Sequence, residues 1–191
     1  MPREFEDTKV IIGAIDGVHV WPVSNHKDLR GRLFKVYTDG PHPSFPENFE
    51  TFEHFFTESK EGVFRGMHFQ GAPHAATKVI SIVRGEALDF LLDTRKDSKT
   101  FAHVQTQALN QDSPVSIYIP EGVAHGYIAL REGTIVSYRQ NVAFCESCDG
   151  GINGSIVENL LPIPLKETIR SERDLHLKEF ASFSYTSKCS Q

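Results

Sequence analysis

The sequence predicts an all-β fold of the sandwich or barrel type. Between residues 62 and 144, short stretches rich in Val, Ile, Phe and Tyr follow one another at short and regular spacing. Glycine, asparagine and proline separate these stretches, and no long repeat of helical period intervenes. Short strands bounded by turn residues are typical of sandwiches and barrels.

The first elements are expected to be strands followed by a loop. Residues 18–38 read as two strands joined by a polar turn near Asp28. Residues 39–50 contain three prolines, which lack the N–H donors that a sheet requires. We therefore expect a loop there, and it is a candidate cover for a site.

The central strands and the C-terminal segments follow in order. The expected strands are residues 62–70, 78–84, 86–95, 102–110, 113–122, 125–130 and 132–144. Residues 149–156 are glycine-rich and favour a flexible loop, and residues 162–169 favour extended chain. Ser171 is a candidate N-cap for a short C-terminal helix over residues 171–180.

Size and charge limit the functional classes. A chain of 191 residues fits a single domain, residues 1–191. The net charge of -5 provides no basic footprint, which argues against a nucleic-acid partner. No stretch approaches the length of a membrane span, and the first residues lack a signal-peptide core. We expect a cytoplasmic protein without a membrane partner.

The three cysteines form one C-x-x-C pair, Cys145 and Cys148, with Cys189 in the tail. Three cysteines cannot form a four-cysteine zinc site. A redox pair or a mixed Cys/His metal site stays open, but no βαβ pattern surrounds the pair. The sequence therefore favours incidental loop cysteines.

Residues 62–70, GVFRGMHFQ, place three polar side chains in an apolar strand. A lone histidine in a strand is usually structural, but His68 has polar company. Gln70 lies two positions later and faces the same side, Arg65 lies three positions earlier, and Lys78 begins the next strand. If these faces line one cavity, it contains a base, two cations and an amide donor.

Two further residues have both a structural and a functional interpretation. His125, in IPEGVAHGYIAL, resembles the second metal-binding motif of cupins, but the His-x-His pair of the first motif is missing. His74 and His103 do not reproduce the spacing of the missing ligands, so we predict no metal there. Tyr138 is either an amphipathic packing residue or a phenol acid.

Several stretches together resemble the dTDP-4-dehydrorhamnose 3,5-epimerase family. They are residues 62–70, TKVISIVRGEALDFLLDTRKDSKTF, IPEGVAHGYIAL, the pair Tyr138 and Arg139, and SERD, and the resemblance runs from about Asp28 to Asp174. It implies a cupin-type jelly-roll barrel, a homodimer, and the epimerisation of a nucleotide-linked 4-keto sugar without a cofactor. The product would enter surface-polysaccharide or deoxysugar biosynthesis.

The resemblance also assigns roles to single residues. His68 matches the family's catalytic base and Asp174 the carboxylate that polarises it. Lys78 matches the lysine that stabilises the enolate, and Tyr138 the tyrosine acid. The expected substrate-binding residues are Arg30, Arg65, Gln70 and His125, of which Gln70 comes from its position in the strand.

The chain departs from the family's pattern where the nucleotide and the sugar are expected. The departures are Lys35, Glu53, Phe55, Ala143, Phe144 and the shortened segment GINGSI. The nucleotide therefore need not be dTDP, and the sugar can be an unusual deoxyhexose or heptose.

Three other functions compete with the epimerase. A ketoisomerase would move the carbonyl between C3 and C4, a metal-dependent cupin oxygenase would need a metal, and a binding module would lack the catalytic residues. The presence of both His68 and Tyr138 favours an epimerase that inverts C3, or both C3 and C5. In the expected dimer, residues 10–23 are a candidate for an exchanged strand.

Overall fold

The computed structural model describes residues 11–36 and 49–182. The predicted all-β class is confirmed, because the described residues form two large sheets and a two-stranded hairpin. The proline-rich loop expected over residues 39–50 lies outside the described residues except for its last two positions. Within the described ranges, no helix reaches the length and hydrophobicity needed to cross a bilayer.

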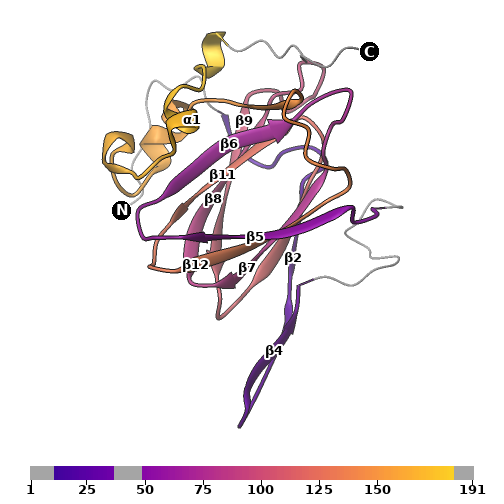
Figure 1. Ribbon diagram of the computed structural model, residues 1–191, viewed down its shortest axis with the longest axis vertical. Helices are drawn as coiled ribbons and strands as arrows, with labels where there is room; N and C mark the ends of the chain where they lie inside the picture. Colours follow the sequence, from indigo (N-terminus) through magenta and orange to yellow (C-terminus); the bar gives the residue numbers. More distant parts are fainter. Residues whose placement is uncertain (1–10, 37–48, 183–191) are drawn as a thin grey trace.

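The two large sheets face each other (Figure 1). The six-stranded sheet has the order β1-β9-β8-β11-β6-β13 and consists of β1 (Ile11–Ile12), β6 (Phe64–Gln70), β8 (Glu86–Asp93), β9 (His103–Asn110), β11 (Val123–Ala129) and β13 (Asp149–Gly151). The five-stranded sheet has the order β2-β10-β7-β12-β5 and consists of β2 (His19–Pro22), β5 (Glu53–Ser59), β7 (Lys78–Arg84), β10 (Val115–Ile119) and β12 (Thr134–Gln140).

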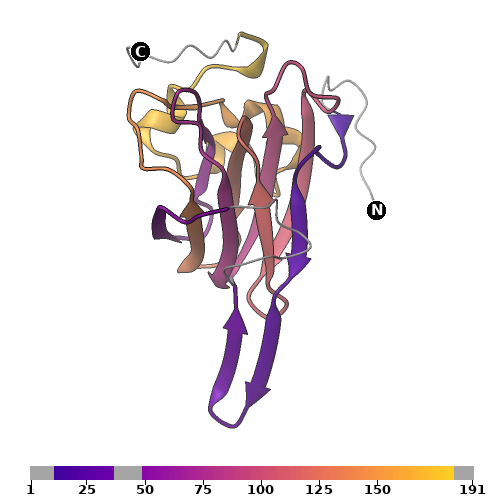
Figure 2. The same cartoon turned by 90° about the vertical axis from the view of Figure 1, so that its right-hand side faces the viewer.

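The β3–β4 hairpin extends away from the two sheets, as Figure 2 shows. It consists of β3 (Ser24–Asp28) and β4 (Gly31–Lys35), which agrees with the two strands and polar turn expected over residues 18–38. The preceding segment, a candidate for exchange between copies, pairs here within its own chain: β1 lies parallel to β9 and β2 antiparallel to β10.

The six-stranded sheet is apolar on both faces. On β8, Leu91 belongs to the cluster between the two sheets, whereas Phe90 and Leu92 belong to a second cluster on the outer face. The C-terminal segment covers that outer face and contributes buried residues such as Val157 and Leu165. This double coverage explains why β8 is buried on both faces, from Asp89 to Asp93 without a break, instead of alternating between buried and exposed residues.

The C-terminal segment consists of short helical turns, drawn in orange and yellow in Figure 1. They are η1 (Gly154–Leu160), η2 (Leu165–Glu167), α1 (Glu172–Leu175) and η3 (Phe180–Ser182). The predicted N-cap is confirmed, because Ser171 Oγ accepts a hydrogen bond from the Asp174 N–H. The expected helix over residues 171–180 is shorter than predicted, since α1 has four residues.

The glycine-rich stretch at residues 149–156 is not a loop throughout, because it begins with β13. An added Cβ at Gly151 would lie 2.6 Å from the Met67 carbonyl oxygen. Gly151 therefore permits β13 to approach β6, and the glycine signal here reflects close packing, not flexibility.

Asp93, at the end of β8, anchors the turn that follows it. Its buried carboxylate accepts hydrogen bonds from Arg95 Nε at 2.8 Å, Ser98 Oγ at 2.6 Å and Thr100 Oγ1 at 2.7 Å. Burial alone would raise the pKa of Asp93, but these bonds outweigh burial and lower it to about 2.

Asp93→Asn is therefore expected to destabilise the fold by roughly 1–2 kcal/mol at pH 7, after allowance for solvent screening near Arg95. The pKa is lowered in the folded state, so the carboxylate's contribution is complete above about pH 4 and is lost as pH falls towards 2. Urea unfolding of both proteins from pH 7 to pH 2 measures the difference. The exposed Asp97→Asn is the control, and an equal effect of both changes would contradict the role of Asp93.

Candidate active site

A cavity of about 720 Å³ lies between the two sheets. This volume is within the range that small-molecule sites occupy. Its walls include His68 of β6, His125 of β11, Lys78 of β7, Tyr138 of β12 and Asp174 of α1. The structure thus brings together all four expected catalytic residues, which lie up to 106 positions apart in the chain.

A β-bulge in β6 directs both Arg65 and His68 into this cavity. His68 pairs with His125 and Arg65 with Tyr127, so the register between β6 and β11 shifts by one residue. Without the shift, side chains three positions apart would face opposite sides of the sheet. The bulge therefore explains why an apolar strand carries these polar residues.

Gly66 makes the bulge sterically feasible. Its φ is 123°, and a Cβ there would lie 2.5 Å from Gly126 Cα and 2.8 Å from the His125 carbonyl oxygen. A side chain would therefore collide with the backbone of β11 and would strain the conformation of Gly66 itself.

His68 and Asp174 form a hydrogen-bonded pair. His68 Nε2 lies 2.6 Å from Asp174 Oδ1, and the Gly66 N–H donates to Asp174 Oδ2 at 3.3 Å. A carboxylate only accepts, so Nε2 carries the proton and the lone pair of Nδ1 is the basic site. Burial alone would raise the pKa of Asp174, but the bonds from His68 and Gly66 outweigh it, so the pKa is lowered.

A second pair lies deeper in the barrel. His125 Nε2 lies 2.6 Å from Asp89 Oδ2, and both side chains are buried. Burial raises the pKa of Asp89, and the bond with His125 opposes this effect. Sequence reasoning missed Asp89, although a carboxylate within the apolar run of β8 could have marked an inward-facing position.

Tyr138 is held by two aromatic contacts. Its ring stacks on Phe55, with centroids 5.0 Å apart, and meets His125 edge-on at 5.7 Å. Burial raises the pKa of Tyr138 well above its ordinary value, and the charge of Asp89 acts in the same direction. The phenol therefore stays protonated and can act as a proton donor.

Lys78 provides a cation with a lowered pKa. Burial lowers the pKa of Lys78 to about 8, while the nearby Asp149 opposes this shift. At pH 7 the amine is still charged and can stabilise a developing oxyanion in a partly desolvated site.

Three arginines add positive charge to the cavity wall, namely Arg65, Arg170 and Arg173. Arg65 Nε donates to Ser59 Oγ at 2.9 Å, and Arg173 pairs with Asp149 at 2.5 Å. Among the described residues, Arg170 Nε is one of the buried donors that have no hydrogen-bond partner. Sequence reasoning did not identify Arg170 or Arg173, and these charges suit an anionic group.

Gln70 lines the cavity, but protein contacts occupy its amide. Nε2 donates to the carbonyl oxygens of His74 at 2.7 Å and Ala143 at 3.0 Å, and Oε1 accepts from the Cys145 N–H at 2.8 Å. Gln70 therefore joins two loops beside the cavity, which fits a positioning role better than the donor role expected from its place in the strand.

Arg30 is not part of this cavity. It lies at the turn of the β3–β4 hairpin, where its side chain is 83% exposed and pairs with Asp28 at 2.5 Å. The other expected substrate-binding residues, Arg65, Gln70 and His125, all line the cavity.

The two cavity histidines are each paired with a carboxylate. His68 and His125 each bond a different carboxylate through Nε2. In the part of the chain that the structure describes, the cluster of three metal-ligating side chains is His74, Cys145 and Cys148, and His103 does not belong to it.

Comparison with known proteins gives the same family throughout. The model of the dTDP-4-dehydrorhamnose 3,5-epimerase family matches residues 13–182. The dTDP-4-dehydrorhamnose 3,5-epimerase of Methanothermobacter thermautotrophicus is 30% identical over 173 residues, which cover 86% of this chain and 90% of that protein. The Salmonella typhimurium enzyme of the same name is 31% identical over 144 residues, which cover 75% and 79% of the two chains.

Solved structures agree with the fold. The dTDP-4-dehydrorhamnose 3,5-epimerase of Elizabethkingia anophelis has a TM-score of 0.78 at 25% identity and covers 91% of this chain and 96% of its own. The enzyme from Sulfolobus tokodaii has a TM-score of 0.75 at 28% identity, with coverages of 95% and 97%. These similarities confirm the cupin-type jelly roll. The chain belongs to the dTDP-4-dehydrorhamnose 3,5-epimerase family.

Proposed function

We propose that the chain is an isomerase that inverts a carbon next to the keto group of a nucleotide-linked 4-keto sugar. The observation that carries this proposal is the position of a base and an acid on opposite walls. His68 lies on the six-stranded sheet and Tyr138 on the five-stranded sheet, with the cavity between them. Inversion requires proton removal from one face of the sugar and proton delivery to the other.

Each step of the reaction has a residue of suitable chemistry. His68 Nδ1 takes the proton, and the C–H electron pair moves into an enolate whose oxygen Lys78 stabilises. Asp174 fixes the tautomer of His68 and stabilises its charged form. Tyr138 then donates its proton to the carbon from the opposite face, and exchange with solvent restores both side chains.

A nucleotide diphosphate would be held by Arg65, Arg170 and Arg173. The Bacillus anthracis dTDP-4-dehydrorhamnose 3,5-epimerase, 28% identical with a TM-score of 0.74, was solved with TDP and PPi bound. Glu53, Phe55 and Phe144, which depart from the family's pattern, also line the cavity. Comparing several nucleotide-linked sugars as substrates therefore determines which nucleobase and which sugar the chain accepts.

We also propose a cytoplasmic homodimer in which residues 1–191 act as a single domain. Arg30 lies outside the cavity of its own chain, so its expected role in binding requires a second copy. Light scattering coupled to size exclusion measures the assembly, and a monomer at micromolar concentration would contradict both the dimer and the role of Arg30.

Deuterium exchange tests the reaction itself. The purified protein is incubated in heavy water with dTDP-, GDP-, UDP- and CDP-linked 4-keto-6-deoxy sugars, and NMR follows each ring carbon. We expect uptake at C3, or at C3 and C5, with one nucleotide preferred. Movement of the carbonyl would indicate a ketoisomerase, and no uptake with any of these sugars would contradict the enolate mechanism for them.

Tyr138→Phe is expected to separate exchange from inversion. The phenyl ring keeps the stacking on Phe55, but the proton donor is lost. We expect deuterium exchange to persist because His68 still acts, while formation of the inverted sugar falls by about 100-fold. NMR measures both rates in one sample.

Tyr118→Phe is the matched control, because Tyr118 is also buried but is absent from the cavity wall. Both rates should stay unchanged in this variant. An equal loss of exchange and inversion in Tyr138→Phe would contradict its role as the acid of the second step.

A further inference from the structure

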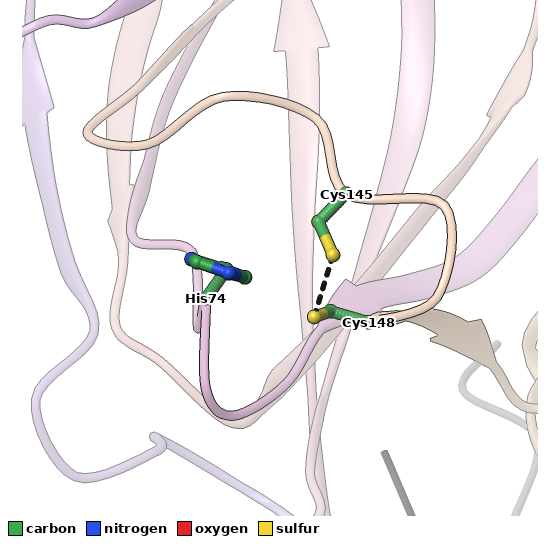
Figure 3. Close-up of side chains that lie close together, drawn as sticks. All are labelled: His74, Cys145 and Cys148. Atoms are coloured by element: carbon green, nitrogen blue, oxygen red, sulfur yellow. Dashed lines mark hydrogen bonds between the residues drawn. The ribbon is translucent and has the colours of Figure 1, made fainter. Parts of the chain in front are cut away.

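Two loops beside the cavity bring a histidine and two cysteines together (Figure 3). His74 lies in the loop between β6 and β7, and Cys145 and Cys148 lie in the loop between β12 and β13. The imidazole nitrogen and both sulfur atoms lie within 4.8 Å of one another. The sequence alone favoured incidental cysteines because no βαβ pattern surrounds the C-x-x-C pair, and His74 was not considered with them.

Backbone contacts hold the three side chains together. The N–H groups of Cys148 and Asp149 donate to the Cys145 carbonyl oxygen at 3.0 and 2.8 Å, which closes the C-x-x-C turn. Gln70, which is 3% exposed, bonds the backbone of both His74 and Cys145, and the Gly71 N–H donates to the Cys148 carbonyl oxygen. The protein itself thus preorganises the cluster.

We propose that His74, Cys145 and Cys148 bind one zinc ion. Two thiolates and an imidazole form a set of ligands that binds zinc in preference to harder divalent ions such as Mg²⁺ and Ca²⁺. Binding releases the two thiol protons, and a water molecule completes the tetrahedral coordination. The ion would join the β6–β7 loop to the β12–β13 loop, which contributes Phe144 to the cavity wall.

His74 is the observation that favours a metal over a disulfide. Cys145 Sγ lies 2.6 Å from Cys148 Sγ, whereas two sulfurs on a tetrahedral zinc ion would lie roughly 3.8 Å apart. A disulfide would shorten the separation to about 2.05 Å and would not use the imidazole nitrogen, which lies within 4.8 Å of both sulfur atoms. Cys145 is partly exposed while Cys148 is fully buried, so the adjustment to a metal falls on Cys145.

Cobalt binding tests the site directly. The full chain is purified in reducing buffer, stripped with a chelator and titrated with Co²⁺, and Zn²⁺ then competes for the site. We expect one ion per chain, a thiolate-to-cobalt absorption band and the spectrum of tetrahedral cobalt. Zn²⁺ should also raise the thermal midpoint, because it binds the folded state.

Three variants and two controls localise the site. Cys145→Ser and Cys148→Ser should weaken metal binding by more than about 100-fold. Loss of a group that only hydrogen-bonds a metal ligand already lowers metal affinity roughly 10–100-fold, and these variants lose a ligand itself. His74→Gln should weaken it and change the cobalt spectrum. Cys189→Ser and the exposed His26→Gln should bind like the parent protein.

Two outcomes would overturn the zinc site. The first is that the parent protein binds Co²⁺ and Zn²⁺ no more tightly than Cys145→Ser does. The other is a mass lower by two hydrogens in reducing buffer, with both cysteines resistant to alkylation, which would identify a disulfide. These measurements do not use the sugar reaction, so their failure leaves the epimerase proposal intact.

Discussion

Replacing His68 with glutamine is expected to lower deuterium uptake at the sugar carbons by about 10³-fold, within the range that a general base contributes. Glutamine has no basic nitrogen, but its amide N–H can take the place of His68 Nε2–H and donate to Asp174. The buried carboxylate therefore keeps a partner, and the fold should be preserved. NMR in heavy water measures uptake, and circular dichroism and thermal unfolding establish that the variant is folded.

His54→Gln is the matched control for this experiment. His54 lies on β5 and bonds Ser137 Oγ at 3.0 Å, but it does not line the cavity. The control should retain activity within a few-fold. If His68→Gln, while folded, exchanges deuterium at a rate close to that of the parent protein, another group is the base and the proposed mechanism is wrong.

The β6 strand shows what the sequence could and could not predict. The apolar pattern and the turn residues indicated the strand, and His68 and Gln70 were expected on one face. Strict alternation would have placed Arg65 on the other face, and only the bulge at Gly66 brings it into the cavity. Bulges depend on the register of the partner strand, which local sequence patterns do not contain.

Residues that act through long-range contacts were the hardest to predict. Asp174 and Tyr138 acquired roles only through the family resemblance, since an aspartate in a turn and a tyrosine in a strand are common features. Arg170 belongs to none of the sequence motifs that indicated the site. It lines the cavity because the C-terminal segment folds over the sheet. His74 meets Cys145 through the hydrogen bonds of Gln70, between loops about 70 residues apart.

Lys78→Met should have the second large effect, because it removes the cation beside the developing enolate. We expect deuterium uptake to fall by about 10²- to 10³-fold, as when a preorganised donor to an oxyanion is removed. Since the pKa of Lys78 is about 8, uptake by the parent protein should also decline above that pH as the amine loses its charge. Lys78→Arg is the matched variant, since it keeps the charge and should show no decline near pH 8.

Lys78→Met should also stabilise the protein in the absence of substrate. The pKa of Lys78 is lowered from 10.5 to about 8 in the folded state, so the folded state binds this proton less tightly than the unfolded chain does. Below pH 8 both states carry the charge and folding bears the full cost of burying it, up to about 3 kcal/mol. Above pH 10.5 both states are neutral and the cost disappears.

Lys78→Met should therefore exceed the parent protein in unfolding free energy by the most at pH 7, and the difference should shrink between pH 8 and 10.5. Chemical denaturation at several pH values measures this difference and cancels the other titrating groups. A variant that is less stable than the parent protein at pH 7 would mean that the Lys78 charge is not costly to bury. Uptake by the parent protein that is unchanged from pH 7 to 9.5 would mean that this charge is not needed for the reaction. A stabilised but inactive variant would mean that the fold tolerates a buried cation because the enolate requires it.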